Sequence, residues 1–415
     1  MTKRLRPWVG NFLLLCISII FFLIILEIGL RILSPQQLYV VRSTPWLERE
    51  NIPNMHTTLT NLDTNEQISI DINSKGFRDH EIDYEKPDNT FRILVLGDSF
   101  TEARQVQLNE TFHKLLETKL NNQNNKNTNN TNNNNNINQY NYQVIAAGVS
   151  GYGTENNLAY LNEWGLRYEP DIVILQFLGN NDIRDNYFGN LYLHNHTYNT
   201  LEKNYPLKYS LTKRIFDKVR IAINSRLHIG VFFEKKLTNL NIIESILLKT
   251  GLINKKESQD VKQSFTVEAE PWTNEIYHGW DETKLLIKEM NTKCNQNNAH
   301  LIIMLTPTDF QVYDEEYKKY EQLISTTLNK IYNSTKVELM IIDFAQQNDI
   351  NYLYLLPKLI DSSTTNDYFG EKDTHFTKLG HELTSNLIYE KLINNDLLPF
   401  LNEQTKDTNI NSSIQ

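Results

Sequence analysis

The sequence predicts a doubly wound α/β fold, in which helices cover both faces of a parallel sheet. Three short, largely apolar runs, at residues 93–96, 142–147 and 171–177, each lead into a polar turn that contains glycine, and segments with helical spacing separate them. Strands buried on both faces read as continuous apolar runs, and their alternation with helices is typical of a parallel sheet. We therefore expect a three-layer doubly wound parallel sheet. An N-terminal transmembrane helix precedes it, and an irregular or helical segment is inserted into it.

The first predicted element is the apolar stretch at residues 8–33. Only two polar residues interrupt the run from Val9 to Leu26, and with the apolar residues beyond Glu27 it reaches the roughly 20 residues that span a bilayer. Three basic residues precede it, so the positive-inside rule keeps residues 1–7 in the cytoplasm. No small-x-small cleavage pattern closes the run, which favours a retained anchor over a cleaved signal peptide. We expect a single-pass membrane protein whose main domain is periplasmic or extracellular.

The remainder divides by composition into a main domain and three accessory segments. The main domain comprises residues 91–184 and 281–395, and a polar lead-in of weak periodicity at 34–90 precedes it. Residues 185–280 are irregular and rich in aromatic side chains, and we interpret them as an insertion that could cap the site. The chain ends in a polar tail at 396–415.

Within the main domain, periodicity predicts further elements in order. A helix at 111–120 leads into residues 121–140, of which thirteen are asparagine. Such a tract buries too little apolar surface to offset its ordering entropy, so we expect a mobile surface loop. The second half alternates helices and strands, with helices predicted at 281–293, 315–332 and 377–394 and strands at 300–305 and 337–343.

Composition excludes several classes of function. The formal net charge of −9 argues against a nucleic-acid surface, and no basic stripe is visible. Cys16 and Cys294 are the only cysteines, which allows neither a disulfide framework nor a thiolate metal cluster. No H-E-x-x-H or comparable ligand spacing occurs, so we expect chemistry without metal or cofactor.

The turn after the first strand carries a hydroxyl in a favourable position. Gly97 permits a sharp exit from the strand, and Asp98-Ser99 stands where a helix would begin. Ligands of open α/β sheets bind at the carboxyl ends of the strands, so Ser99 could serve as a nucleophile. The alternative is that Ser99 or Asp98 only caps the next helix.

A serine nucleophile requires a base, and the segment before the last helix offers one. Asp373 and His375 are two residues apart, so in an extended segment both side chains point to the same side. An imidazole can accept the hydroxyl proton while a carboxylate fixes its tautomer. The alternative is a loop pair with structural hydrogen bonds. His381, inside the closing helix, is a second candidate imidazole, for which we expect a packing or surface role.

Attack on an acyl carbon also creates an oxyanion that needs preorganised donors. The backbone N–H of Ser99, a backbone N–H at Gly151 and the side-chain amide of Asn181 all follow predicted strand ends and could converge. Taken singly, such glycines and asparagines are ordinary residues of turns.

Together these segments resemble the SGNH/GDSL-type hydrolases. The family's first block matches Gly97-Asp98-Ser99, its second the glycine of Val149-Ser150-Gly151, its third the G-x-N-D at 179–182, and its last the segment of Asp373 and His375. The resemblance implies that Ser99 is the nucleophile, His375 the base and Asp373 its orienter, with Ser99, Gly151 and Asn181 forming the oxyanion hole. The family usually spaces the last pair as D-x-x-H. The D-x-H spacing here resembles the polysaccharide O-acetyltransferase branch.

The resemblance implies an esterase that acts on ester-linked acyl groups, with acetyl favoured, through an acyl-Ser99 intermediate outside the cytoplasm. Transfer of the acyl group to a cell-envelope polysaccharide is an alternative, because a sugar hydroxyl can replace water as the acceptor. A non-catalytic envelope protein that uses the pocket for binding is a third reading. The expected partner is an acylated small molecule or glycan. The G-x-S-x-G elbow of α/β-hydrolase lipases is absent.

Overall fold

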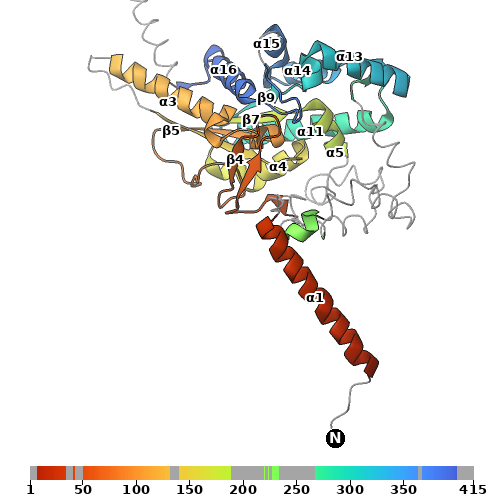
Figure 1. Ribbon diagram of the computed structural model, residues 1–415. Coiled ribbons are helices and arrows are strands. Elements are labelled where there is room, and N and C mark those ends of the chain that lie inside the picture. The colour runs from red at the N-terminus through yellow and green to blue at the C-terminus, as the bar shows by residue number, and fades with distance from the viewer. Residues whose placement is uncertain are drawn as a thin grey trace, which may run out of the picture. The chain divides into compact units, whose positions relative to one another are not determined.

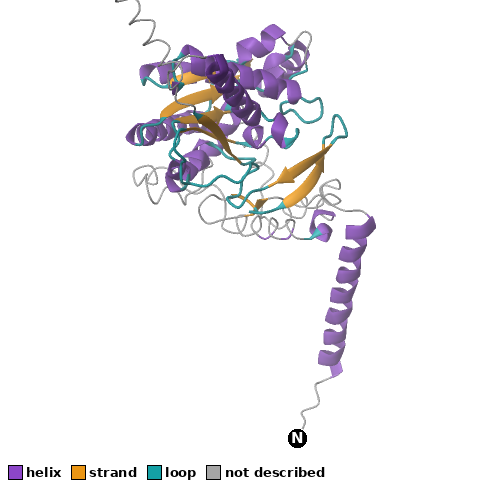
Figure 2. Cartoon of the chain, turned by 90° about the vertical axis from the view of Figure 1, so that its left-hand side faces the viewer, coloured by secondary structure: helices purple, strands orange, loops and turns teal. Residues whose placement is uncertain are grey.

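A computed structural model describes residues 7–33, 41–42, 50–130, 140–187, 227–232, 267–362 and 367–399, with the single residues 219 and 223. The chain divides into two compact units. Figures 1 and 2 show their described elements. The first comprises Met1–Ile52 and Tyr205–Gln259, and the second Pro53–Asn204 and Asp260–Gln415. Most of the predicted insertion and the tail beyond residue 399 lie outside the described residues.

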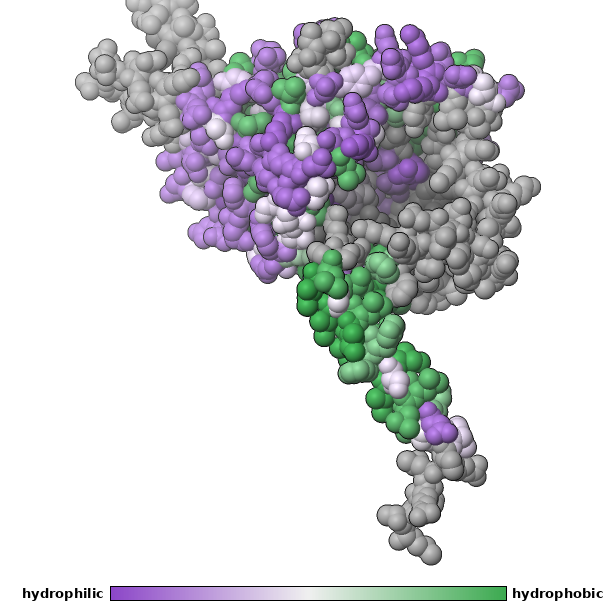
Figure 3. Space-filling view, in the orientation of Figure 1, coloured by the Kyte–Doolittle hydropathy of each residue, from purple (hydrophilic) through white to green (hydrophobic). Residues whose placement is uncertain are grey.

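The first unit is built around helix α1 (Pro7–Leu33), with a short antiparallel pair of strands, β1 (Val41–Arg42) and β2 (Glu50–Asn51). Most apolar side chains of α1 are exposed, and Figure 3 shows them along the face in view. The stretch Gly10–Leu33 has a mean hydropathy of 3.0 over its most apolar window, so by length and composition it could cross a membrane. Near its end, the Glu27 carboxylate accepts hydrogen bonds from the backbone N–H groups of His228 and Ile229, at 3.1 and 2.9 Å.

The second unit contains a five-stranded parallel sheet in the order β11-β9-β7-β5-β6. Helices α3 and α16 pack together on one face, and α4 and α11 cover the other (Figure 1). The predicted three-layer, doubly wound parallel sheet is confirmed. The strands are β5 (Thr90–Gly97), β6 (Asn141–Gly148), β7 (Ile172–Phe177), β9 (His300–Leu305) and β11 (Asn351–Tyr354). The longer helices are α3 (Phe112–Asn130), α4 (Thr154–Glu163), α5 (Gly179–Tyr187), α11 (Asn274–Gln296), α13 (Asp314–Leu323), α14 (Lys336–Gln347) and α16 (Lys378–Asn394).

Several shorter strands and helices lie between these longer elements along the chain. The lead-in forms an antiparallel hairpin of β3 (His56–Thr60) and β4 (Gln67–Asp71), and a second strand pair joins β8 (Ala269–Glu270) to β10 (Ile331–Tyr332). Short helices of the second unit include α2 (Ser99–Glu102), α12 (Asp309–Val312) and α15 (Leu356–Ser362), with 3₁₀ turns at Leu108–Glu110 and Gly165–Tyr168 and a π turn at Ile324–Leu328.

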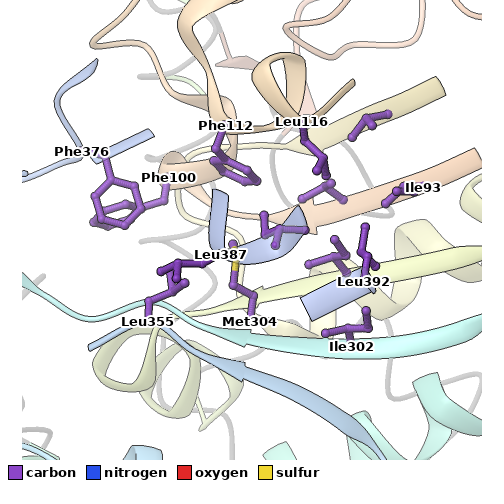
Figure 4. Close-up of a cluster of buried hydrophobic side chains, with 14 of the residues drawn as sticks. Ile93, Phe100, Phe112, Leu116, Ile302, Met304, Leu355, Phe376, Leu387 and Leu392 are labelled. Carbon is purple, nitrogen blue, oxygen red and sulfur yellow. The ribbon is translucent and has the colours of Figure 1, made fainter. Parts of the chain in front are cut away.

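A cluster of buried hydrophobic side chains fills the space between the sheet and the pair α3/α16 (Figure 4). Phe112 and Leu116 of α3 and Leu387 and Leu392 of α16 lie in this cluster together with side chains of β5 and β9. At its edge Phe376 stacks edge-on against Phe100, with ring centroids 4.9 Å apart. This core therefore includes Phe100 and Phe376, the residues that directly follow Ser99 and His375, and it fixes the segments that carry them.

Two predicted elements differ from the structure in the second half of the chain. The helix predicted at 315–332 ends early, because α13 stops at Leu323 and residues 331–332 pair with β8 as strand β10. Residues 337–343 were expected as a strand but belong to α14, and the fifth strand is β11. The helix buries Val337, Ile341, Phe344 and Ala345, a spacing of four, three and one, and leaves Leu339 exposed. A short apolar run fits the strand period of two and the helix period of 3.6 equally well. Here the segment forms a helix, whose apolar face packs against α11.

The asparagine tract also differs from its prediction as a loop. Helix α3 continues into the tract as far as Asn130, whereas residues 131–139 lie outside the described part. Adding residues to an existing helix is far easier than nucleating one, and the buried face of α3 provides the nucleus. Asn121 bonds across to β6, donating to the Tyr142 carbonyl at 2.9 Å and accepting from its N–H at 3.0 Å.

Two helices extend past the predicted limits of the main domain. Helix α5 continues beyond the predicted limit at 184, and α11 begins before 281. In the polar tail, Leu398 is fully buried in the core beside α16.

Candidate active site

Strand β5 delivers Ser99 to the carboxyl edge of the sheet. The strand ends at Gly97, and α2 begins at Ser99 with Asp98 as its N-cap, whose carboxylate accepts the Phe100 N–H at 2.9 Å. The Gln176 side chain of β7 accepts the Asp98 N–H at 3.0 Å. A Cβ at Gly97 would lie 2.5 Å from Gln176 Oε1, so the turn has no room for a side chain there. Asp98 is thus the helix cap, and the Ser99 hydroxyl is left for other contacts.

The structure brings Ser99, His375 and Asp373 into one hydrogen-bonded relay. His375 Nε2 lies 2.7 Å from Ser99 Oγ, and His375 Nδ1 lies 2.5 Å from Asp373 Oδ1. The Phe100 ring packs against the imidazole with centroids 4.8 Å apart. With Nδ1 donating to the carboxylate, Nε2 is the nitrogen that can accept the hydroxyl proton.

Two carboxyl groups set the charge around this imidazole. Burial opposes ionisation of Asp373, but its hydrogen bond and charge interaction with His375 outweigh this and hold the Asp373 pKa below its usual value. Burial raises the pKa of Asp98 to about 6, although the Phe100 N–H, His375 and Asn181 favour its ionised form. Asp373 is therefore ionised at neutral pH and can stabilise an imidazolium.

Gly151 follows β6 and Asn181 lies in α5, just after β7, so they come from the two strands that flank β5. Gly151 has a φ of 82°, a backbone conformation that favours glycine. Asn181 was expected in a turn but belongs to a helix. Its Oδ1 accepts from Arg184 at 3.1 Å, which leaves its amide nitrogen as the donor, and its side chain favours the ionised form of Asp98.

Sequence reasoning missed Glu102, which holds the Gly151 turn in place. Its buried Oε2 accepts the Ser150 N–H at 2.9 Å and the Ser150 hydroxyl at 2.5 Å, while Oε1 accepts from Arg104 at 2.6 Å. Glu102 is three residues after Ser99, but its partner Ser150 is in the next strand-end turn. No local sequence signal indicates such a bond.

Sequence reasoning also missed Gln105, whose Nε2 donates to Asp373 Oδ2 at 3.1 Å. The other candidate base, His381, points to α3 instead, where its Nδ1 accepts the Phe112 N–H at 3.2 Å. Burial lowers the pKa of His381 to about 3. His381 therefore has a packing role.

Comparison with known proteins gives only distant similarity. No protein-family model matches the chain. No curated protein matches it either. Among solved structures, the psychrotrophic esterase EstA from Pseudoalteromonas sp. is 13% identical with a TM-score of 0.37, covering 74% of this chain and 98% of its own. An acetyl xylan esterase, AlAXEase, is 12% identical with a TM-score of 0.36, covering 72% and 98%. Axe2, an acetylxylan esterase from Geobacillus stearothermophilus, is 10% identical with a TM-score of 0.35, covering 73% and 94%.

Proposed function

We propose that this chain is a serine esterase of the SGNH/GDSL type that removes ester-linked acyl groups, acetyl in the first instance. The observation that carries the proposal is the continuous relay from Ser99 Oγ through His375 to Asp373. The order of the matching motifs along the chain supports the family assignment. The apolar helix α1 supports an anchored enzyme, with the N-terminus cytoplasmic and the main domain periplasmic or extracellular.

The reaction follows from the contacts of the relay. Neutral His375 accepts the Ser99 proton at Nε2 as Ser99 Oγ bonds to the acyl carbon, and the carbonyl oxygen becomes an oxyanion. We assign its stabilisation to the N–H groups of Ser99 and Gly151 and to the Asn181 amide. The imidazolium gives its proton to the leaving alcohol as the ester C–O bond breaks. Water, deprotonated by His375, then attacks the acyl-Ser99 carbonyl. The bond from Ser99 Oγ to the acyl carbon breaks, the imidazolium returns its proton to Ser99 Oγ, and the carboxylic acid leaves.

The proposal is tested with the full chain in mild detergent and Ser99→Ala as the matched variant. We expect release of p-nitrophenol from p-nitrophenyl acetate by the native protein and a loss of at least about a thousandfold in the variant. A phosphonate monoester should add one mass increment to the peptide that contains Ser99, and none to the variant. Equal release and equal labelling by both proteins would refute an enzyme and favour the non-catalytic binding protein.

Transfer to a polysaccharide is the second candidate, favoured by the D-x-H spacing of Asp373 and His375. The same acyl-Ser99 would form, and a sugar hydroxyl would replace water as its acceptor. Adding oligosaccharides to the p-nitrophenyl acetate reaction and searching for acetylated sugar by mass spectrometry distinguishes the two. Acetylated sugar that appears only with intact Ser99 supports transfer, and acetate alone supports hydrolysis.

A further inference from the structure

The β3–β4 hairpin lies in the polar lead-in, outside the segments that resemble known hydrolases. Its turn nevertheless contacts the loop that carries the acid and the base. Asp63 Oδ1 accepts the Lys372 N–H at 2.8 Å, and the Leu62 carbonyl accepts from Lys372 Nζ at 2.9 Å. A Cβ at Gly370 would overlap Asp63 Oδ2, so the loop approaches the hairpin as closely as glycine permits. Lys372 immediately precedes Asp373.

The hairpin turn is itself firmly defined. Asn61 Oδ1 accepts the N–H groups of Asp63 and Thr64 at 2.8 and 2.9 Å, and the Asn61 N–H donates to the Glu66 carbonyl at 2.8 Å. Behind the turn, Ile68 and Ile70 of β4 are completely buried. The turn therefore offers a preorganised surface to the loop at 370–375.

The same turn also binds the segment that follows the nucleophile. Asn61 Nδ2 donates to the Gln105 carbonyl at 2.8 Å, and the buried Arg78 guanidinium bonds the carbonyls of Ser69 in β4 and Val106, at 3.1 and 2.6 Å. From this fixed backbone the Gln105 side chain reaches Asp373 Oδ2, while Asp373 Oδ1 faces His375. Both oxygens of the carboxylate are thus held, one by the base and one by Gln105.

We propose that the hairpin turn and Gln105 together form a positioning device for the acid of the relay. The turn fixes the loop of Asp373 through Lys372, and Gln105 holds the second carboxylate oxygen so that the first stays aligned with His375 Nδ1. This rests on the proposed function, in which Asp373 orients His375. The loop is not part of the sheet. Its own backbone bonds, such as that from the Gly370 N–H to the His375 carbonyl at 3.0 Å, close it, and these side-chain bonds fix it against its neighbours.

The test uses the full chain in detergent with p-nitrophenyl acetate turnover and the rate of Ser99 phosphonylation. Gln105→Met removes the donor and keeps the length, and we expect kcat and the labelling rate to fall about tenfold with KM within about twofold. Gln105→Glu keeps the shape better but places a like charge beside Asp373, so it should lose more activity than the Met variant. Asp63→Ala should lower kcat about fivefold. The matched control is Gln67→Met, whose amide donates to Thr60 Oγ1 on the exposed side of the hairpin, and it should stay within twofold of the native protein.

A purely structural role would give a different pattern. If kcat in the Gln105 and Asp63 variants stays within twofold of native, the positioning device is refuted while the esterase stands. If Glu and Met at 105 act alike and both lower the unfolding temperature in proportion to activity, Gln105 only supports the fold, and the proposal is likewise refuted. If the native protein shows no turnover that depends on Ser99, the proposed function fails, and this inference fails with it.

Discussion

Glu102 connects the nucleophile helix to the turn that carries Gly151, and its removal is the most informative perturbation. Its side chain is completely buried, and a Cβ at Gly148 would lie 2.5 Å from the Glu102 backbone nitrogen. The two turns thus pack with no space between them. Glu102→Ala removes the acceptor of the Ser150 N–H and hydroxyl and the partner of Arg104.

The size of the effect follows from these partners. Removing one member of a buried charged pair costs about 3–5 kcal/mol. The Arg104 side chain remains 21% exposed and can turn to water, so we expect the lower end, about 3 kcal/mol of unfolding free energy. Glu102→Gln keeps one oxygen for Ser150 and loses the charge, for which we expect about 1–2 kcal/mol. Loss of an oxyanion donor costs about a hundredfold or more in kcat, and a displaced Gly151 N–H should cost about tenfold or more.

The pH dependence provides a separate check. Burial would raise the Glu102 pKa, but Arg104 and Ser150 outweigh it and hold the pKa below its usual value. A depressed carboxyl pKa stabilises the folded state above the unfolded-state pKa, and this stabilisation is lost as pH falls through the folded-state value. The difference between native protein and Glu102→Ala should therefore be full at pH 7 and shrink below about pH 4.

The measurements are urea unfolding of the full chain in detergent and p-nitrophenyl acetate turnover. The matched control is Glu117→Ala. Glu117 is another carboxylate that bonds β6, accepting the Val144 N–H at 2.7 Å, but it lies away from the carboxyl edge. It should lower stability and leave kcat unchanged. The argument that Glu102 positions the Gly151 turn would be refuted if Glu102→Ala had the same kcat as the native protein, or if Glu117→Ala lost as much kcat as Glu102→Ala.

Three further outcomes are expected. Burial raises the pKa of Glu282 to about 8. In the unfolded chain this carboxyl ionises above about pH 4, so the folded state loses stability as pH rises from about 4 to 8. Glu282→Gln should therefore raise the unfolding temperature at pH 8 and not at pH 4. Because the pKa of His381 is lowered, the folded state is fully stabilised above about pH 6.5 and loses free energy of unfolding as pH falls from there towards 3. In urea unfolding, His381→Gln should reduce the slope of this free energy against pH by one proton. Gly97→Ala should force a Cβ into Gln176 and lower both stability, by about 1–3 kcal/mol, and the rate of Ser99 phosphonylation.

Each of these has a clear contrary result. An unfolding temperature of Glu282→Gln that is the same as native at pH 8 would mean that the carboxyl finds compensation in the folded state. An unchanged acid slope in His381→Gln would assign the acid sensitivity to other groups, such as the buried His113, whose pKa burial also lowers. If Ser99 of Gly97→Ala were phosphonylated at the same rate as in the native protein, the turn at Ser99 could widen without loss of reactivity.

The sheet and the turn at Ser99 could be predicted because their signals are local. Continuous apolar runs such as 93–96 mark strands buried on both faces, and the residue after each run must lie at the carboxyl edge. The same reasoning gave a wrong prediction for residues 337–343, because seven residues rich in apolar side chains fit the strand period and the helix period alike. The lead-in hairpin did carry a signal, the alternation of Ile68, Ile70 and Ile72, which a search for period two would have found.

The supporting bonds of the site could not be predicted. Gln105 and Asp373 are 268 residues apart, and Lys372 and Asp63 are 309 apart. A single hydrogen bond between such distant residues leaves no periodicity or spacing in the sequence. Glu102, Gln105 and Asp63 are ordinary polar residues until the fold places them together.

The two sides of the relay are consequently held by different means. Ser99 follows the central strand β5 by two residues. The ladders with β6 and β7 fix the end of that strand, and Gln176 fixes the turn after it. Asp373 and His375 lie in a loop outside the sheet, where a bridge between Phe369 and Phe376 closes the loop and the hairpin turn supports it. The nucleophile side depends on backbone hydrogen bonds that most substitutions preserve. The acid–base side depends in addition on individual side chains of the lead-in and of Gln105, so substitutions in the lead-in should alter activity more than their distance in the sequence suggests.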